Sequence, residues 1–186
     1  HRGVFYVLSK LKLNVLGDIG CYTLGAVPPL SAMDAVVCMG ASIGMAIGFD
    51  KADPEAHSRS VAVIGDSTFI HSGITGLIDA VYNKAKVTVI ILDNRTTGMT
   101  GHQDHPATGK TIKKEDTYEL DLAEVCRAVG VKDVCTVNPN DLAATESAVK
   151  AALANEGVSV VIAKKPCVLL KKRLYEGFRV NEKCKK

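Results

Sequence analysis

The sequence predicts an α/β protein with a doubly wound parallel sheet that carries helices on both faces. Short apolar runs rich in β-branched residues, at 61–64, 87–92 and 158–163, alternate with segments that have helical spacing. The chain of 186 residues has the size of one ordinary domain, and 47% hydrophobic but only 5% aromatic residues are typical of an aliphatic α/β core. We expect this domain to occupy residues 1–165.

The N-terminal third is expected to deliver one strand to the sheet and one helix to a face of it. The predicted segments are helical spacing over 2–10, a strand over 13–16, an apolar run over 33–39, a helix over 40–49 and a polar loop over 51–59. Within the helix, Gly40, Gly44 and Gly48 recur at four-residue spacing on one face. A stripe without side chains predicts close packing against the sheet or a partner helix.

The central stretch, residues 61–103, is expected to form a strand, helix, strand unit. A turn at 65–68 is predicted to lead into a helix over 72–84, with Ser72 as its N-cap. The second strand, 87–92, is β-branched over most of its length, as befits a parallel strand buried on both faces. The polar loop at 94–109 is long enough to form a lid, and a solvated connection is the alternative.

The rest of the scaffold is predicted to continue this alternation. The expected segments are a helix over 120–129, a strand over 134–137, a helix over 141–154 with Asp141 near its cap, and a strand over 158–163.

Polar residues follow two strands of the central stretch at the points where the strands end. Asp66 follows the first strand and Asn94 the second. Ligands of parallel α/β sheets lie beyond the carboxyl ends of the strands, so both side chains are expected to reach one crevice. Hard oxygen donors suit Mg²⁺ when phosphate oxygens and water complete its shell. These residues therefore predict a metal-diphosphate site.

Four motifs carry a resemblance to a known family. They are GDIGCYTLG at 17–25, CMGASIGMAIG at 38–48, a GDS and LDN pair with 28 positions from Asp66 to Asn94, and NRTTGMTGHQDHPATG at 94–109. In this order they resemble the thiamine diphosphate-binding domain of the indolepyruvate ferredoxin oxidoreductase alpha subunit. The chain departs from the usual pattern with Ser67 in place of Gly and Asp93 in place of Asn.

The resemblance implies a thiamine diphosphate and Mg²⁺ site with a defined set of residues. Mg²⁺ would be held by Asp66, by the Asn94 side chain and by the backbone carbonyl of Thr96, while backbone N–H groups near Ser67 and Thr68 would bind phosphate. The implied cofactor-binding residues are Gly17, Asp18, Gly20, Cys21, Met39, Gly40, Ala41, Ser42, Gly65, Asp66, Ser67, Thr68, Asn94, Thr96, Thr97, Gly98, Met99 and Thr100. No catalytic residue is assigned in this chain, because the Glu that activates thiamine is expected on another domain.

Several of these residues have a second interpretation from their chemistry alone. A carboxylate in the turn at Asp18 could cap the turn by accepting backbone N–H groups. Cys21 could be a packed thiol, and His71 could bond a backbone carbonyl instead of a phosphate oxygen. His102 and His105 lack further convincing ligands, which makes zinc improbable.

The resemblance implies oxidative decarboxylation of an aryl pyruvate, such as indolepyruvate, to its acyl-CoA with ferredoxin as electron acceptor. The implied partners are a pyrimidine-binding domain of the same enzyme, a beta subunit, ferredoxin, coenzyme A and the 2-oxo acid. Alternatives are a pyruvate or general 2-oxo acid ferredoxin oxidoreductase, a nonoxidative thiamine diphosphate decarboxylase, and a noncatalytic Mg-nucleotide module. No P-loop or GxGxxG pattern supports the last of these.

Charge and cysteine spacing bound the remaining possibilities. A net charge of +3 with no basic patch argues against a nucleic-acid partner, and the absence of a long apolar run argues against a membrane span, so we expect a cytoplasmic protein. The six cysteines form no CxxC pair. Cys126, Cys135 and Cys167 are expected in the core. Residues 166–186 are expected to link to an absent ferredoxin-like domain, with Cys184 as an iron-sulfur ligand of the full subunit and no cluster in this chain.

Overall fold

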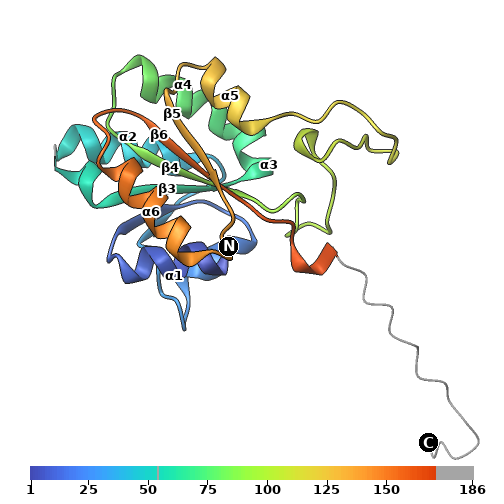
Figure 1. Ribbon diagram of the computed structural model, residues 1–186, viewed down its shortest axis with the longest axis horizontal. Coiled ribbons are helices and arrows are strands. Elements are labelled where there is room, and N and C mark those ends of the chain that lie inside the picture. The colour runs from blue at the N-terminus through green and yellow to red at the C-terminus, as the bar shows by residue number, and fades with distance from the viewer. Residues whose placement is uncertain (54, 171–186) are drawn as a thin grey trace, which may run out of the picture.

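The computed structural model describes residues 1–53 and 55–170, and it has the predicted doubly wound α/β architecture. Six strands form one parallel sheet in the order β2-β1-β3-β4-β6-β5. The strands are β1 (Asn14–Gly17), β2 (Ala35–Val36), β3 (Ser60–Gly65), β4 (Thr88–Asp93), β5 (Asp133–Val137) and β6 (Ser159–Lys164). Figure 1 shows the sheet edge-on between two helical layers.

Helices cover both faces of the sheet (Figure 1). On one face lie α1 (Arg2–Lys10) and α6 (Leu142–Leu153), which contact each other. On the other face lie α2 (Ala41–Ala52), α4 (Ile74–Tyr82) and α5 (Leu122–Ala128). The shorter helical elements are η1 (Cys21–Ala26), η2 (Ala56–Ser58), α3 (Asp66–Thr68), η3 (Phe69–Gly73), η4 (Pro106–Thr108) and η5 (Val168–Leu170).

The two central strands are apolar between their first and last residues because each face of the sheet has its own core. In β3, Val61 and Val63 join the cluster beneath α1 and α6, while Ala62 and Ile64 join the cluster beneath α2, α4 and α5. Successive residues of a strand point to opposite faces, so a run without polar residues is what a sheet covered on both sides requires. The predicted strands at 61–64 and 87–92 are therefore confirmed.

The helix after β3 begins earlier than the sequence predicted. The chain is helical from Asp66 onward, through α3 and the π-helical segment η3, and into α4. Ser72 lies inside η3 and is not an N-cap, because Gly65, still extended at φ −81° and ψ 158°, turns directly into the helix. The predicted turn at 65–68 is thus the first helical turn.

Two further expectations about packing differ from the structure. A Cβ added at Gly44 or Gly48 would meet nothing within 4 Å, so these two glycines do not serve close packing among the described residues. Cys126 is fully buried as predicted, whereas Cys135 and Cys167 are only partly buried. No helix among the described residues is long and apolar enough to cross a membrane.

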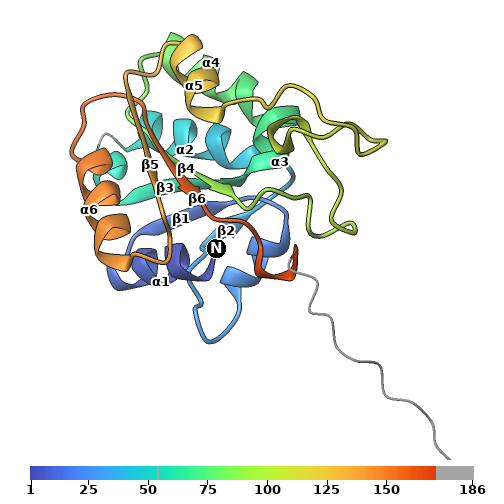
Figure 2. The ribbon, with the colours of Figure 1, turned by 45° about the vertical axis from the view of Figure 1, so that its right-hand side comes forward.

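The long connection from β4 to α5 projects away from the body of the fold, as seen from two directions in Figures 1 and 2. It starts at the carboxyl end of the sheet and returns through η4 to the N-cap of α5 at Asp121, which accepts from Ala123 N–H and Glu124 N–H. The linker predicted over 166–186 lies mostly outside the described residues, as does Cys184, so both expectations remain predictions.

Candidate functional site

A small cleft lies at the carboxyl ends of β1, β3 and β4. It is beside the topological switch point between β1 and β3, where β2 was added on one side of β1 and β3 on the other. Its volume is about 100 Å³. The predicted site residues that line it are Gly20, Cys21, Met39, Gly65, Asp66, Ser67, Thr68, Asn94, Thr96, Thr97, Gly98, Met99 and Thr100. Four separate stretches of the sequence are thereby brought together. Five predicted residues, Gly17, Asp18, Gly40, Ala41 and Ser42, do not line it.

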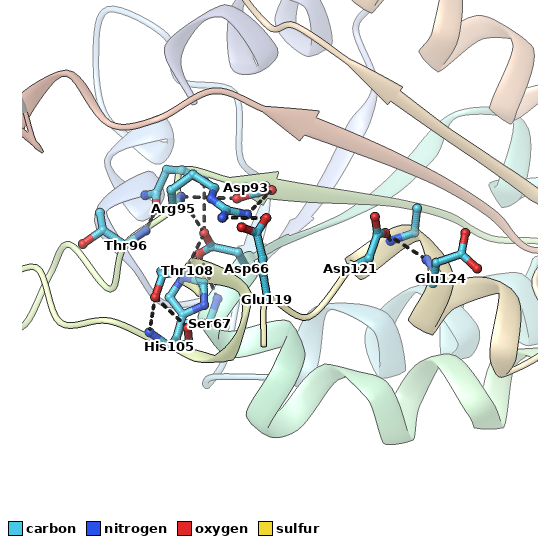
Figure 3. Close-up of polar contacts among 12 residues, drawn as sticks. Asp66, Ser67, Asp93, Arg95, Thr96, His105, Thr108, Glu119, Asp121 and Glu124 are labelled. Atoms are coloured by element: carbon cyan, nitrogen blue, oxygen red, sulfur yellow. Dashed lines mark hydrogen bonds and ion pairs between the residues drawn. The ribbon is translucent and has the colours of Figure 1, made fainter. Parts of the chain in front are cut away.

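Asp66 is the acidic residue of the cleft, and only 3% of its surface is exposed. Its Oδ1 accepts one N–H, from Ser67 at 2.8 Å. Its Oδ2 accepts from Asn94 N–H at 3.1 Å and Arg95 N–H at 2.9 Å. The backbone after β4 therefore folds around the residue that follows β3, as Figure 3 shows.

Asn94 and Thr96 contribute the next polar groups of the cleft. The Asn94 Oδ1 accepts Thr96 N–H at 3.0 Å, which closes a local Asx turn and leaves one lone pair of that oxygen. The Thr96 hydroxyl is buried and finds no hydrogen-bond partner among the described residues. Buried polar atoms are usually hydrogen-bonded, so an unpartnered hydroxyl beside the cleft is a feature to be explained.

A second carboxylate, Asp93, lies behind Asp66 at the end of β4 (Figure 3). Burial, and after it the charge of Asp66, raise the pKa of Asp93 to about 6, while Arg95 and Lys164 act in the opposite direction. The Arg95 guanidinium lies 3.9 Å from Asp93 and 2.8 Å from Glu119. Arg95 thus joins the end of β4 to the far arm of the projecting loop.

Asp18 lies outside the cleft lining and bonds to the start of α2. Its carboxylate is fully buried and accepts Gly40 N–H at 2.8 Å and the Ser42 hydroxyl at 3.2 Å. Ala41 N–H is bonded to the carbonyl of Cys38. The N-terminus of α2, which carries the predicted cofactor-binding residues Gly40, Ala41 and Ser42, already holds a protein carboxylate. An incoming anion would be repelled by that charge, because both would compete for the same end of the helix dipole.

Tyr22 is a residue of the cleft that sequence reasoning missed, as is Ile19. The ring of Tyr22 lies against Gly20 and Gly65, and a Cβ on Gly65 would come within 2.7 Å of it. Its hydroxyl donates to the carbonyl of Ile19 at 3.2 Å, and burial raises its pKa. The signal available in the sequence was an aromatic residue close to glycines of two predicted turns, since such glycines leave room for a ring.

The histidines of the loop divide between two environments. His105, which was not among the predicted site residues, is buried with its Nε2 at 3.2 Å from Asp66 Oδ2. His102 lies near Gly98 and has a buried Nδ1 without a hydrogen-bond partner among the described residues.

His71 lies outside the loop, in the helical segment after β3. Its Nδ1 is 2.6 Å from the hydroxyl of its neighbour Ser72, so this nitrogen has a partner without a phosphate or a backbone carbonyl.

With this geometry in place, comparison with known proteins identifies the family. Residues 18–163 match the family model described as the thiamine pyrophosphate enzyme, C-terminal TPP binding domain. The chain belongs to this family.

Two curated relatives agree with the membership. The chain is 46% identical over 178 residues to the indolepyruvate oxidoreductase subunit IorA of Methanothermobacter thermautotrophicus, covering 91% of this chain and 28% of the relative. It is 42% identical over 196 residues to the subunit of the same name from Archaeoglobus fulgidus, covering 99% of this chain and 31% of the relative. The chain therefore spans less than a third of the length of these relatives.

Solved structures share the fold of this thiamine pyrophosphate domain at low sequence identity. The 2-oxoglutarate:ferredoxin oxidoreductase from Magnetococcus marinus, solved with 2-oxoglutarate, coenzyme A and succinyl-CoA, superposes with a TM-score of 0.76 at 17% identity, covering 90% of this chain and 62% of that chain. The benzoylformate decarboxylase of Polynucleobacter necessarius gives 0.60 at 20% identity, covering 88% and 33%. These likenesses establish the α/β fold of the thiamine pyrophosphate enzymes.

The oxygen donors of the thiamine pyrophosphate domain fit a Mg²⁺ ion that is shared with a diphosphate. Asp66 Oδ1 and Asn94 Oδ1 belong to cleft residues, and so does the backbone carbonyl of Thr96, which is the third predicted ligand. No group of three or more His, Cys, Asp or Glu that could hold a metal exists among the described residues. Mg²⁺ is usually bound by one or two carboxylates together with substrate phosphates and water, not by a cage of protein ligands. A donor set this small therefore suits a metal that arrives with its phosphate.

Proposed function

We propose that this chain is the thiamine diphosphate and Mg²⁺ binding domain of a cytoplasmic enzyme that oxidatively decarboxylates aryl pyruvates such as indolepyruvate to acyl-CoA, with ferredoxin as electron acceptor. The observation that carries the proposal is the cleft of this family member, where Asp66, Asn94 and Thr96 present oxygen atoms beside a turn of backbone N–H groups. The names of the curated relatives favour indolepyruvate as substrate.

In this proposal the chain's own residues bind and orient. Asp66, Asn94 and Thr96 hold Mg²⁺, and the backbone of Ser67 and Thr68, in the first turn of the helix, receives the diphosphate, because helix starts bind anions. The Ser67 N–H also donates to Asp66 Oδ1, which joins the phosphate-binding turn to the metal ligand. The remaining cleft residues border the rings, among them Cys21, Met39, Thr97, Gly98, Met99 and Thr100. Bound thiamine diphosphate supplies an electron sink for cleavage next to the 2-oxo group.

The activating acid and the redox centres are assigned to other parts of the enzyme. Asp66 is the one acidic residue among those that line the cleft, and it is committed to the metal. The Glu that activates thiamine is therefore proposed on a pyrimidine-binding domain of the same enzyme. Iron-sulfur clusters, the beta subunit and ferredoxin complete the electron path, and residues 166–186 connect this domain to the cluster-bearing part.

The first prediction concerns Asp66. Asp66→Ala should abolish Mg²⁺-dependent binding of thiamine diphosphate, because the loss of the carboxylate leaves the diphosphate charge poorly neutralised. Calorimetry on the intact assembled protein measures the affinity, with Asp133→Asn at the amino end of β5 as a control that should bind normally. Unchanged affinity in Asp66→Ala would contradict the metal assignment. Turnover with indolepyruvate, pyruvate and 2-oxoglutarate, each with coenzyme A and ferredoxin, then tests the substrate class.

A further inference from the structure

We propose that His105 is a positioning residue of the metal site, whose imidazole orients the Asp66 carboxylate so that Oδ1 is left for Mg²⁺. This inference rests on the proposed function, because it assigns a role toward the metal of that site. It starts from a contact that neither the motifs nor the chemistry of the cofactor required. The two side chains come from segments 39 positions apart in the sequence and meet at the edge of the cleft.

The two oxygens of Asp66 are used unequally. Oδ2 is surrounded by Asn94 N–H, Arg95 N–H and His105 Nε2, at 3.1, 2.9 and 3.2 Å. Oδ1 accepts only the N–H of Ser67 among the described residues. A carboxylate oxygen has about two lone pairs. Oδ2 is therefore fully engaged by protein nitrogens, and Oδ1 is the atom with capacity for a cation.

His105 supplies the side-chain part of this arrangement. The other three contacts to Asp66 come from backbone N–H groups, which follow the chain wherever it goes. The side chains of His105 and Asp66 are each 4% exposed, so water competes little for either. The Nε2–H direction falls short of hydrogen-bond alignment here, although the distance to Oδ2 is within range. Contacts of this kind in unliganded sites commonly tighten when the ligand binds.

Hydrogen bonds and a buried neighbour fix the turn that carries His105. Thr108 N–H donates to the His105 carbonyl at 2.8 Å, and the Thr108 hydroxyl also donates to that carbonyl at 2.8 Å. Ala107 of the same turn is fully buried in the core cluster beneath α2, α4 and α5. Leu120 N–H donates to the Pro106 carbonyl at 3.0 Å and fixes the far side of the turn. Figure 3 shows the ring directed at Asp66 from this turn.

The arrangement follows a general rule of metal sites. Carboxylates that bind metals are held by outer hydrogen-bond partners, and the loss of such a partner costs about 10–100-fold in metal affinity or activity. In this chain the partner sits on the loop that follows Asn94. His105 therefore couples the conformation of that loop to the geometry of the metal ligand.

The experiment removes the contact and then restores its donor. His105→Phe keeps a buried ring but loses the nitrogen, and His105→Gln places an amide nitrogen at about the reach of Nε2. Mg²⁺ is titrated by calorimetry into the intact assembled protein at a fixed concentration of thiamine diphosphate. We expect His105→Phe to weaken the apparent Mg²⁺ affinity about 10-fold or more, and His105→Gln to stay within about threefold of the wild type.

Three comparisons keep the test decisive. Thermal melting without Mg²⁺ is measured for each variant, and the rescue by Gln must occur at matched stability. His102→Phe, in the same loop but without a contact to Asp66, should bind Mg²⁺ as the wild type does. If His105→Phe does not fold, His105→Asn replaces it, because its shorter side chain keeps polarity but cannot reach Oδ2, and it should show the same loss.

The outcomes separate this inference from the function on which it rests. A wild-type protein that shows no Mg²⁺-dependent binding of thiamine diphosphate would overturn the proposed function. A wild-type protein that binds both, together with unchanged Mg²⁺ affinity in His105→Phe or His105→Asn, would overturn the role of His105 alone. Equal losses in His105→Phe and His105→Gln would also overturn it, because the donor would then be irrelevant.

Discussion

Replacement of Asp18 tests whether this carboxylate holds the fold or the cofactor. In Asp18→Ala the N–H groups of Ile19 and Gly40 and the hydroxyl of buried Ser42 lose their acceptor. A buried donor left unpaired costs about 1–3 kcal/mol, and the partly exposed N–H groups cost less because water can replace the carboxylate, so the three together cost about 2–6 kcal/mol. The lost charge at the helix N-terminus adds to this. We expect the free energy of unfolding to fall by about 4 kcal/mol.

The assay is urea unfolding of the chain without cofactor, followed by far-UV circular dichroism. Asp141→Ala is the matched control, because Asp141 also caps a helix through Ala144 N–H but is exposed, and such caps contribute about 1 kcal/mol. A loss in Asp18→Ala no larger than in Asp141→Ala would refute the reasoning. If stability were unchanged and thiamine diphosphate binding lost, Asp18 would be the cofactor contact that the sequence predicted.

Two further predictions use the charges and glycines of the same region. The pKa of Asp93 in the folded chain is raised from 3.8 to about 6, so the folded state holds the proton more tightly and stability falls as pH rises from about 4 to about 6. Asp93→Asn should therefore raise the free energy of unfolding of the metal-free chain by about 1–2 kcal/mol at pH 7.5 and hardly at pH 4. Urea unfolding in EDTA measures this difference, and an equal effect at both pH values would count against the raised pKa. Gly40→Ala should destabilise by more than about 2 kcal/mol, because Gly40 has φ +88° and its Cβ would lie 2.6 Å from Ser72 Cβ. At Gly48, within α2, an added Cβ would point into open space, so Gly48→Ala should stabilise the chain by about 0.5–1 kcal/mol. Thermal melts compare the two variants, and a higher melting temperature for Gly40→Ala than for Gly48→Ala would contradict the structure.

The strands were predictable because burial on both faces of the sheet is enough to determine their residue types. Two apolar faces force continuous hydrophobic runs in β3 and β4, and such runs are visible in the sequence. The helix start after β3 was not predictable in the same way. Ser72 and Gly73 resemble the boundary of a helix, and only packing of the whole segment shows that the chain is already helical at Asp66.

The candidate site shows the same division. Asp66, Asn94 and Thr96 line one cleft, since the strand ends of a parallel sheet meet at one edge, and their role toward a metal stays a prediction. Asp18 and His105 make contacts across the fold, with Gly40 in one case and Asp66 in the other. Spacing along the chain carries no information about such contacts. A carboxylate in a glycine turn and a histidine in a polar loop look alike whether they face a ligand or a neighbour.

The π-helical segment η3 lies between Asp66 and α4 and determines the rotation about the helix axis between Asp66 and the core-facing residues of α4. A π turn contains one more residue than an α turn, and one residue corresponds to about 100° around a helix axis. Deletion of a single residue from Phe69–Gly73 would restore a regular helix. Leu77 and Ala80 could then remain in the core only if Asp66 swung to another side of the axis. The extra residue in this segment therefore rotates the start of the helix relative to α4. One continuous helix can thereby place Asp66 in the cleft and the apolar residues of α4 in the core.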